Sequence, residues 1–183
     1  MLFIVTGKIH SGKTTLVRKA ICELSKKGWK FSGILSKVVF EKGKREGYNV
    51  LDLETDRSFP FLTKTPDFKS KKYKPEKIGD YYLLDGAVEK ISNLLLKAKR
   101  RNILVIDELG PLEIIRKKGF WKTAAELFGE NKRNIIVVVR DRILDEFLRV
   151  IKGKKRKIFH IGRKGVLRGV VSCIEERCKT STS

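Results

Sequence analysis

Short, fully apolar runs alternate along this chain with longer segments whose apolar residues recur every three to four positions. The runs have the length and β-branched content of buried strands, and they cover residues 2–5, 103–106, 135–139 and 158–161. The periodic segments predict helices over residues 15–27, 83–98, 121–128, 143–151 and 166–178. Because short buried strands alternate with helices, we expect an α/β fold with a mostly parallel sheet and helices on both faces.

A second pattern lies between the first two apolar runs. Residues 30–40 and 48–53 both read as extended, and the charged segment 41–47 (EKGKREG) between them carries two glycines. This arrangement predicts a β-hairpin that extends the sheet with antiparallel strands. Residues 58–62 predict a further short strand, which Pro60 places at an edge. The Lys/Pro-rich segment 63–79 predicts a long surface loop, which in a compact domain is more often functional or mobile than accidental.

Length and composition limit the possible class of protein. The 183 residues predict a single domain over 1–178 and a disordered tail over 179–183. No stretch is long and apolar enough to span a membrane, and the N-terminus lacks the features of a signal peptide. The chain has three cysteines, Cys22, Cys173 and Cys178, an odd number without the spacing of a zinc site. We therefore expect a reduced, cytoplasmic setting. Cys22 and Cys173 are expected to pack as small apolar residues in helices.

Positive charge dominates the chain: 42 Lys and Arg residues against 21 Asp and Glu give a net charge of +21. Such a field attracts polyanions, including nucleotides and nucleic acid. Solvated faces and helix ends account for basic clusters equally well, and the chain has no recognisable RNA- or DNA-binding motif. We therefore expect no more than weak, non-specific nucleic acid binding. The clusters are Lys69, Lys71, Lys72, Lys74 and Lys77; Lys97, Lys99, Arg100 and Arg101; and Lys152, Lys154, Lys155, Arg156 and Lys157.

Residues 7–14 read GKIHSGKT, a complete G-x-x-x-x-G-K-[ST] phosphate-binding loop. A predicted strand precedes it and a predicted helix comes directly after it, which is the context that this motif requires. Gly7 and Gly12 allow consecutive N–H groups to turn towards one anion, and the helix N-terminus adds to the attraction. Lys13 should reach the β- and γ-phosphates, and the Thr14 hydroxyl should ligate Mg²⁺. The predicted nucleotide contacts are Gly7, Lys8, Ile9, His10, Ser11, Gly12, Lys13, Thr14 and Thr15.

The apolar run 103–106 ends in acidic residues, ILVIDELG over 103–110. Ligands of open α/β sheets bind at the carboxyl edge, so Asp107 is placed to hold Mg²⁺ from the side opposite Thr14. Glu108 can orient a water for attack on the γ-phosphorus and take its proton, although it could also be a solvated or helix-capping acid. Glu113 is a second carboxylate that either shapes the site or simply lies near a helix start.

Arginines also come after two of the later apolar runs. Arg140 should reach the same edge, where it could contact the γ-phosphate and stabilise transition-state charge. It could equally pair with Asp141 or Glu108. Arg163 comes after the run 158–161 and raises the same possibility.

At these residues the chain resembles the thermophilic nucleoside-triphosphatases, a family of P-loop NTPases with an added catalytic glutamate that is related to the human cancer-related nucleoside-triphosphatase. The matching pieces are the phosphate loop, the hairpin FSGILSKVV…REGYNVLDL and IDELGPLEI over 106–114. The resemblance implies a three-layer P-loop fold and Mg²⁺-dependent hydrolysis of ATP, GTP and other nucleoside triphosphates. It places Glu108 at the catalytic glutamate and Glu113 at a family carboxylate. It adds nucleotide contacts at Ile103, Leu104, Val105, Ile106, Asp107, Glu108, Leu109 and Gly110.

Two other functions share part of this pattern. A nucleoside or nucleotide kinase would need an acceptor pocket and usually an Arg-rich lid. Because residues 158–161 are expected in the sheet, the basic segment 152–168 leaves no lid of adequate length. A nucleic-acid-associated ATPase is favoured by the net charge alone. Hydrolysis is therefore the leading prediction, with ATP and GTP used at comparable efficiency and no phosphoryl transfer to nucleosides or their monophosphates.

Overall fold

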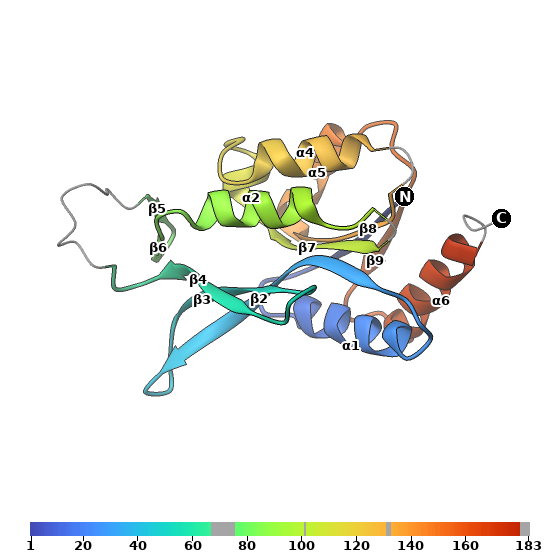
Figure 1. The fold of residues 1–183 in the computed structure, drawn as a ribbon, viewed down its shortest axis with the longest axis horizontal. Coiled ribbons are helices and arrows are strands. Elements are labelled where there is room, and N and C mark those ends of the chain that lie inside the picture. The colour runs from blue at the N-terminus through green and yellow to red at the C-terminus, as the bar shows by residue number, and fades with distance from the viewer. Residues whose placement is uncertain (67–75, 101, 131–132, 180–183) are drawn as a thin grey trace.

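The computed structural model describes residues 1–66, 76–100, 102–130 and 133–179. Within these residues a sheet lies between two layers of helices (Figure 1). Its strands are β1 (Leu2–Gly7), β2 (Phe31–Glu41), β3 (Lys44–Asp52), β4 (Ser58–Thr63), β5 (Lys77–Ile78), β6 (Tyr81–Leu83), β7 (Ile103–Leu109), β8 (Ile135–Arg140) and β9 (Arg156–His160). The helices are α1 (Lys13–Ser25), α2 (Ala87–Lys97), α3 (Pro111–Ile114), α4 (Trp121–Gly129), α5 (Leu144–Val150) and α6 (Val166–Lys179), with a 3-10 turn η1 over Asp141–Ile143.

The strands lie in the order β5-β6-β4-β3-β2-β7-β8-β1-β9. Strands β2, β7, β8, β1 and β9 are parallel, and β3, β4, β6 and β5 continue the sheet with antiparallel pairing. The parallel block and the predicted β2–β3 hairpin are confirmed, and the antiparallel part is larger than one hairpin. Because β1, β7 and β8 are parallel neighbours, their carboxyl ends meet at one edge of the sheet.

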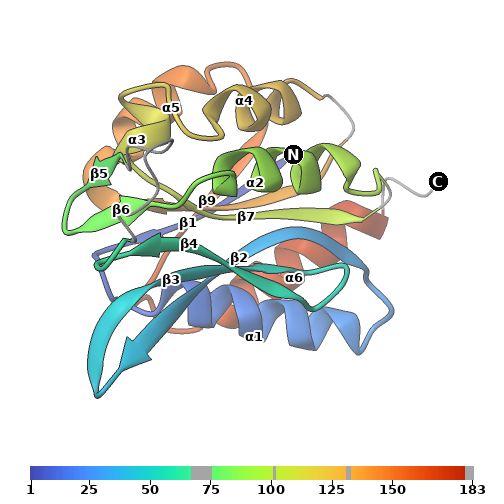
Figure 2. The ribbon, with the colours of Figure 1, turned by 60° about the vertical axis from the view of Figure 1, so that its left-hand side comes forward.

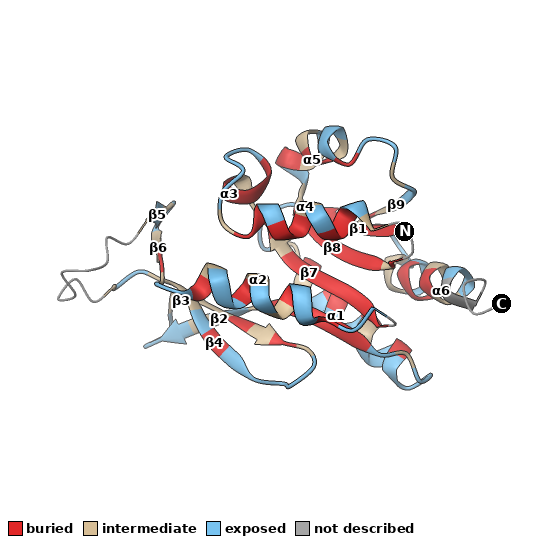
Figure 3. Ribbon diagram, turned by 45° about the horizontal axis from the view of Figure 1, so that its top comes forward, coloured by how far each residue is buried: buried red, intermediate tan, exposed pale blue. Residues whose placement is uncertain are grey.

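Side chains of the central strands alternate between two cores. Leu2 and Ile4 of β1 pack in a cluster with α2, α4 and α5, whereas Phe3 and Val5 pack in a cluster with α1 and α6. Figure 2 shows the two helical layers on opposite faces of the sheet, and Figure 3 shows β7 and β8 buried between them. Burial on both faces explains why these strands read as continuous apolar runs in the sequence.

The β2–β3 hairpin is tighter than the sequence predicts. Only Lys42 and Gly43 lie between the strands, and both have positive φ, 48° and 75°. A two-residue turn with positive φ at both positions matches the twist of the flanking strands. The expected loop over 41–47 is therefore wrong, because backbone pairing continues through charged residues such as Lys44, opposite Glu41.

Strand β4 is not the edge of the sheet, so the edge prediction from Pro60 is wrong. β6 pairs with β4 at Leu62 and Thr63, beyond the proline, and β5 then forms the edge. Since pairing with β6 starts after Pro60, its missing N–H costs no hydrogen bond there. Residues 67–75 of the expected surface loop 63–79 lie outside the described residues, and its described end contains β5.

Two helix expectations also need correction. The helix expected over 83–98 begins at Ala87, because Leu83 pairs in β6 and Gly86 adopts a left-handed φ of 67° that ends the extended segment. Helix α1 begins two residues earlier than expected, at Lys13.

Cys22 on α1 is exposed rather than packed as an apolar residue, and Cys173 is partly buried. Most of the expected tail, 180–183, lies outside the described residues, as do the basic residues Lys69, Lys71, Lys72, Lys74 and Arg101.

Candidate functional site

The phosphate-binding loop joins the carboxyl end of β1 to the start of α1. A Cβ at Gly7 would collide with the Ile161 side chain, and Gly12 has a left-handed φ of 88°. The Ile161 N–H donates to the Thr6 carbonyl at 2.8 Å, which holds this residue against the loop. Glycine is therefore required at both positions for this backbone.

Lys13 is the first residue of α1, and its ammonium group lies across the loop. Its Nζ donates to the carbonyl oxygens of Gly7 at 3.0 Å and Lys8 at 2.6 Å. Burial lowers the pKa of Lys13, and the negative charges of Glu108 and Asp107 partly oppose that effect. The residue is only 5% exposed, and its contacts with two loop carbonyls place the cation where an anion bound by the loop would meet it.

Asp107 is buried at the carboxyl end of β7, beside α1. Its Oδ2 accepts a hydrogen bond from the Ser36 backbone N–H at 3.0 Å. Burial raises its pKa to about 7, while hydrogen bonds from Ser36 and Thr14 and the charge of Lys13 act in the opposite direction. The other oxygen, Oδ1, is buried and has no hydrogen-bond partner among the described residues. A carboxylate oxygen without a partner, close to the Thr14 hydroxyl, fits the hard oxygen ligands that Mg²⁺ prefers.

Glu108 and Arg140 come together from neighbouring strands β7 and β8. Arg140 Nε lies 2.7 Å from Glu108 Oε1, in an ion pair whose side chains are about one quarter exposed. Of the partners considered from the sequence, Arg140 therefore pairs with Glu108. The pair lies at the rim of the site and stays accessible to solvent, which a group that exchanges a proton with water requires.

Glu113 is buried in α3, which comes directly after β7. Its Oε2 accepts a hydrogen bond from the Gly110 backbone N–H at 3.0 Å and so caps α3. Burial raises its pKa to about 7, with the Gly110 hydrogen bond and the positive charge of Arg140 acting against it. A Cβ at Gly119 would lie 2.5 Å from Glu113 Oε1, so the carboxyl group is enclosed. The structure thus gives Glu113 a role in building the turn after β7.

The remaining predicted residues are placed differently. His10 has a positive φ of 61°, and Arg45 Nη1 donates to its Nε2 at 2.7 Å. Arg163 is exposed in the turn after β9 and does not line the pocket beside Glu108. The structure does not bring the predicted contacts of strand β7 to the site, because their side chains are buried in the two cores: Ile103, Leu104, Val105, Ile106 and Leu109.

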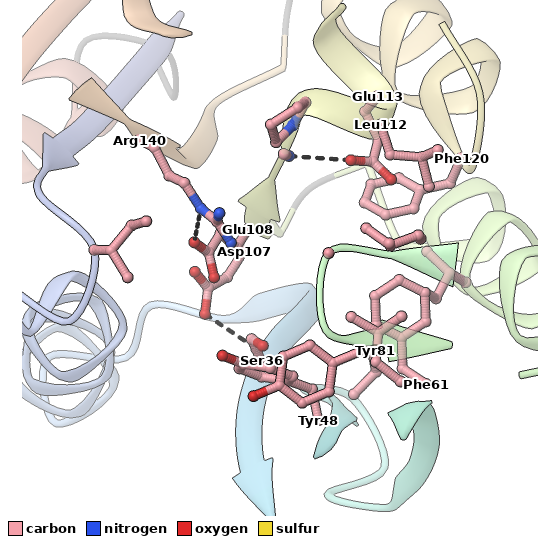
Figure 4. Close-up of a pocket in the computed structure, with 18 of the residues that line it drawn as sticks. Ser36, Tyr48, Phe61, Tyr81, Asp107, Glu108, Leu112, Glu113, Phe120 and Arg140 are labelled. Carbon is pink, nitrogen blue, oxygen red and sulfur yellow. Dashed lines mark hydrogen bonds and ion pairs between the residues drawn. The ribbon is translucent and has the colours of Figure 1, made fainter. Parts of the chain in front are cut away.

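A pocket of about 520 Å³ opens beside Asp107, Glu108 and Arg140 (Figure 4). Aromatic and aliphatic side chains from β2, β3, β4, β6, α3 and the residue before α4 form part of its wall, among them Ile34, Tyr48, Phe61, Tyr81, Leu112 and Phe120. Of the phosphate loop, only Ile9 and His10 line it. This volume falls within the range of about 300–1,000 Å³ that small-molecule sites occupy.

Several of these residues could not be identified from local patterns. Ser36 acts through its backbone N–H, which any residue carries, and the aromatic wall gathers from strands far apart in the sequence. Ile161 meets the loop only because β9 lies beside β1. The one available signal was the hairpin segment REGYNVLDL, which contains Arg45 and Tyr48 and forms part of the resemblance to the nucleoside-triphosphatases.

Known proteins that are similar to this chain are nucleoside-triphosphatases. The model of the NTPase family matches residues 2–166. A nucleoside-triphosphatase THEP1 of Ignicoccus hospitalis is 32% identical over 156 residues, which cover 85% of this chain and 84% of the relative. A THEP1 of Saccharolobus solfataricus is 30% identical over 138 residues, with 74% and 73% covered.

Solved structures show the same fold. The human cancer-related nucleoside triphosphatase has a TM-score of 0.74 at 20% identity, with 95% of this chain and 97% of the other covered. THEP1 of Aquifex aeolicus has a TM-score of 0.73 at 24% identity, with 96% and 99% covered. The expected three-layer P-loop fold and the resemblance to the nucleoside-triphosphatases are confirmed: this chain belongs to the NTPase family.

Proposed function

We propose that this protein hydrolyses nucleoside triphosphates, ATP and GTP among them, to nucleoside diphosphate and phosphate with Mg²⁺ as cofactor. The observation that carries the proposal is the meeting of Lys13, Asp107 and Glu108 at the carboxyl edge of the sheet, beside the phosphate loop. The curated relatives are named nucleoside-triphosphatases, which agrees with this chemistry.

The loop and Lys13 bind the phosphates. Backbone N–H groups of the loop and the N-terminus of α1 attract the negative oxygens. The Lys13 ammonium exchanges its contacts with the Gly7 and Lys8 carbonyls for the β- and γ-phosphate oxygens. Because these groups contact only phosphate, they bind any nucleoside triphosphate alike.

Thr14 and Asp107 are the residues that would hold Mg²⁺, through a hydroxyl and the carboxylate oxygen Oδ1. Mg²⁺, when bound, neutralises phosphate charge and favours departure of the diphosphate. Ser36 keeps Asp107 in this orientation through its N–H. These two residues would be enough protein ligands, because Mg²⁺ is usually held by few protein groups together with substrate phosphates and water.

Glu108 supplies the base. A water beside its carboxylate attacks the γ-phosphorus, the bond from phosphorus to the β–γ bridging oxygen breaks, and the water's proton passes to Glu108. Arg140 orients the Glu108 carboxylate through their 2.7 Å ion pair. Its guanidinium carries donors beyond Nε that can meet charge developing on the γ-phosphate.

The direct test is phosphate release from γ-labelled ATP or GTP with no second substrate. Free labelled phosphate should appear from both nucleotides, and a chelator of Mg²⁺ should stop it. Lys13→Ala should lower turnover by about 10²–10³, the usual effect of losing one charge-stabilising donor. Lys19→Ala removes an equal charge from an exposed position of the same helix and should leave turnover near the native rate. Label that remains on ATP until an acceptor is supplied would instead identify a kinase.

The proposal also includes the cellular compartment of the protein. Cys22 and Cys173 are free thiols, and thiols persist in a reduced compartment. We place the protein in the cytoplasm, where nucleoside triphosphates are available. No helix in the ranges that the structure describes is long and apolar enough to cross a membrane.

A further inference from the structure

The pocket beside Glu108 extends away from the phosphate loop. Figure 4 shows Asp107, Glu108 and Arg140 at one end, and Phe61, Tyr81 and Phe120 at the other. The triphosphatase reaction needs the first end, but none of the steps above uses the second. A pocket of about 520 Å³ is large for the single water that hydrolysis consumes.

The triphosphate's own base cannot account for this space. The loop amides hold the α- and β-phosphates, Lys13 reaches the β- and γ-phosphates, and the cation site lies at the γ end. Asp107 and Glu108 therefore face the γ-phosphate, and the nucleoside extends in the opposite direction. The pocket begins at these carboxylates and continues beyond them, between β3, β4, β6 and α3.

Its far wall suits a flat ring. Tyr48 and Tyr81 meet edge to face with ring centroids 5.1 Å apart. Phe61 and Phe120 add two more aromatic surfaces from β4 and from the segment before α4. Aromatic walls of this kind stack on planar heterocycles with little preference for their substituents.

Its rim suits an anion. Arg45, Arg116, Arg140 and Arg142 all line the pocket. Arg45 uses Nη1 on His10 and Tyr48, whereas its buried Nε has no hydrogen-bond partner within the described ranges. A buried guanidinium donor without a partner favours a negatively charged ligand group. The exposed carboxylate of Asp80 lies on the same lining and can accept from a hydroxyl or a ring N–H.

We propose that this pocket binds a second small molecule, a planar aromatic ring that carries an anionic group, while a nucleoside triphosphate occupies the phosphate loop. Nucleoside monophosphates have this chemistry and are the probes that we would use. The proposal rests on the assignment of the triphosphate to the loop. The bound ring faces Tyr81 and Phe61, and the anion faces Arg45 and Arg140.

Occupation of the pocket has a consequence for hydrolysis. A ligand beside Glu108 restricts the space through which the attacking water enters. Phosphate release should therefore fall as the monophosphate is added, and a higher ATP concentration should not restore it. Inhibition that ATP relieves would show that the ligand occupies the triphosphate site, and would overturn the proposal.

The decisive measurement is calorimetric titration of the full chain with adenosine, guanosine, cytidine and uridine monophosphates. A non-hydrolysable triphosphate analogue and Mg²⁺ are present at saturation. At least one monophosphate should bind under these conditions, and more tightly than its nucleoside, which lacks the anion. Absence of binding at millimolar concentration, or equal binding of the uncharged nucleoside, would refute the proposal.

Matched variants locate the ligand. Arg45→Gln should weaken monophosphate binding about tenfold or more, because it removes a charged hydrogen-bond donor. Lys44→Gln is its control: it removes the same charge from the preceding, exposed position and should leave binding unchanged. Tyr81→Ala should weaken binding about tenfold by loss of stacking, and Tyr81→Phe should retain it. Tyr82→Ala is its control, since Tyr82 is next in β6 and does not line the pocket.

Phosphate release without monophosphate is measured on each of these variants. A folded, hydrolysing Tyr81→Ala protein that still binds monophosphate normally would contradict the pocket assignment. If native protein releases no phosphate but binds monophosphate beside the analogue, the hydrolase proposal fails while this one stands. The two proposals are thereby tested separately.

Discussion

At the scale of single residues, the structure holds the charged groups of the site in defined positions. Glu108 pairs with Arg140, Lys13 donates to two carbonyls of its own loop, and Asp107 keeps one buried oxygen without a partner among the described residues. Burial and contacts within the protein therefore keep these groups in place at the site. Such preorganisation lowers the cost of reaching the transition state.

Glu108→Gln separates base catalysis from binding. The amide keeps the size of the side chain and can still accept from Arg140, but it cannot take a proton from water. Turnover should fall by about 10²–10⁴, the usual contribution of a positioned general base. Triphosphate affinity, measured by calorimetry, should stay close to native. Glu89→Gln, on the exposed face of α2, is the control. Normal turnover with collapsed binding would make Glu108 a structural residue.

At the scale of elements, the phosphate loop depends on the neighbouring strand β9. The sequence motif predicts the glycines, but the reason for Gly7 is the Ile161 side chain, which hydrogen bonding of Ile161 to Thr6 brings against the loop. The loop and the segment after β9 are therefore one packing unit, although about 150 positions separate them in sequence.

Gly7→Ala should consequently disrupt triphosphate binding. The added methyl group overlaps Ile161, and the loop must move to relieve the overlap. Overpacking of this kind costs about 1–3 kcal/mol, which corresponds to a loss of about 5-fold to 150-fold in affinity. Ile161→Ala in the same chain should restore part of the affinity. Gly129→Ala is the control, since nothing lies within 4 Å of its Cβ position and its φ is not left-handed. If Gly7→Ala binds the triphosphate with native affinity, contact with Ile161 is not the reason for glycine at position 7.

The free energy of unfolding depends on pH through Glu113, the residue that caps α3. Its pKa rises from 4.5 in a free side chain to about 7 in the folded protein, because it is buried. The folded state thus holds the proton more tightly than the unfolded state. The resulting stability is complete below about pH 4.5 and is lost as the pH rises towards about 7 and beyond.

Glu113→Gln should remove this dependence. Denaturant unfolding at pH 5 and pH 8 gives the free energy of unfolding, and the native protein should lose up to about 3 kcal/mol more than the variant between these conditions. Burial also raises the pKa of Asp107 to about 7, but Asp107 is present in both the native protein and the variant and changes their stability with pH equally. A native protein whose stability changes no more than that of the variant would show that Glu113 is ionised throughout.

At the scale of the whole molecule, the net charge of +21 is the property that could most mislead about function. Part of it serves the site, since Lys13, Arg45 and Arg140 converge there. Exposed lysines such as Lys152 and Lys155 lie instead in the connection between α5 and β9. A field of this strength attracts polyanions whether or not a specific site exists.

Nucleic acid should therefore bind through charge alone. Affinity for random DNA or RNA should fall by about tenfold or more between about 50 mM and 200 mM salt, as counterion release requires. Sequence should make no difference, and phosphate release should not be stimulated. A filter-binding or anisotropy titration at the two salt concentrations measures this. Salt-resistant, sequence-selective binding would favour the nucleic-acid-associated ATPase over the present proposal.

The sequence alone determined the parts of this protein that depend on local order. The parallel core strands read as apolar runs because both of their faces are buried, and the phosphate loop could be identified because its residues act at neighbouring positions. Asp107 and Glu108 could be placed in the same way, since residues that end a parallel strand lie at the carboxyl edge of the sheet. Less was predictable where tertiary pairing outweighs local pattern, as at Leu83, which joins β6 rather than α2.

Only the tertiary structure decided which partners these residues meet. Arg140 had two acidic partners open to it, and the register of β7 beside β8 brings it to Glu108. The support of Asp107 by the Ser36 N–H, the contact of Ile161 with Gly7 and the aromatic pocket all join segments distant in sequence. Such contacts leave no periodicity or spacing in the chain, because they depend on strand order, and strand order is set by the packing of the whole sheet.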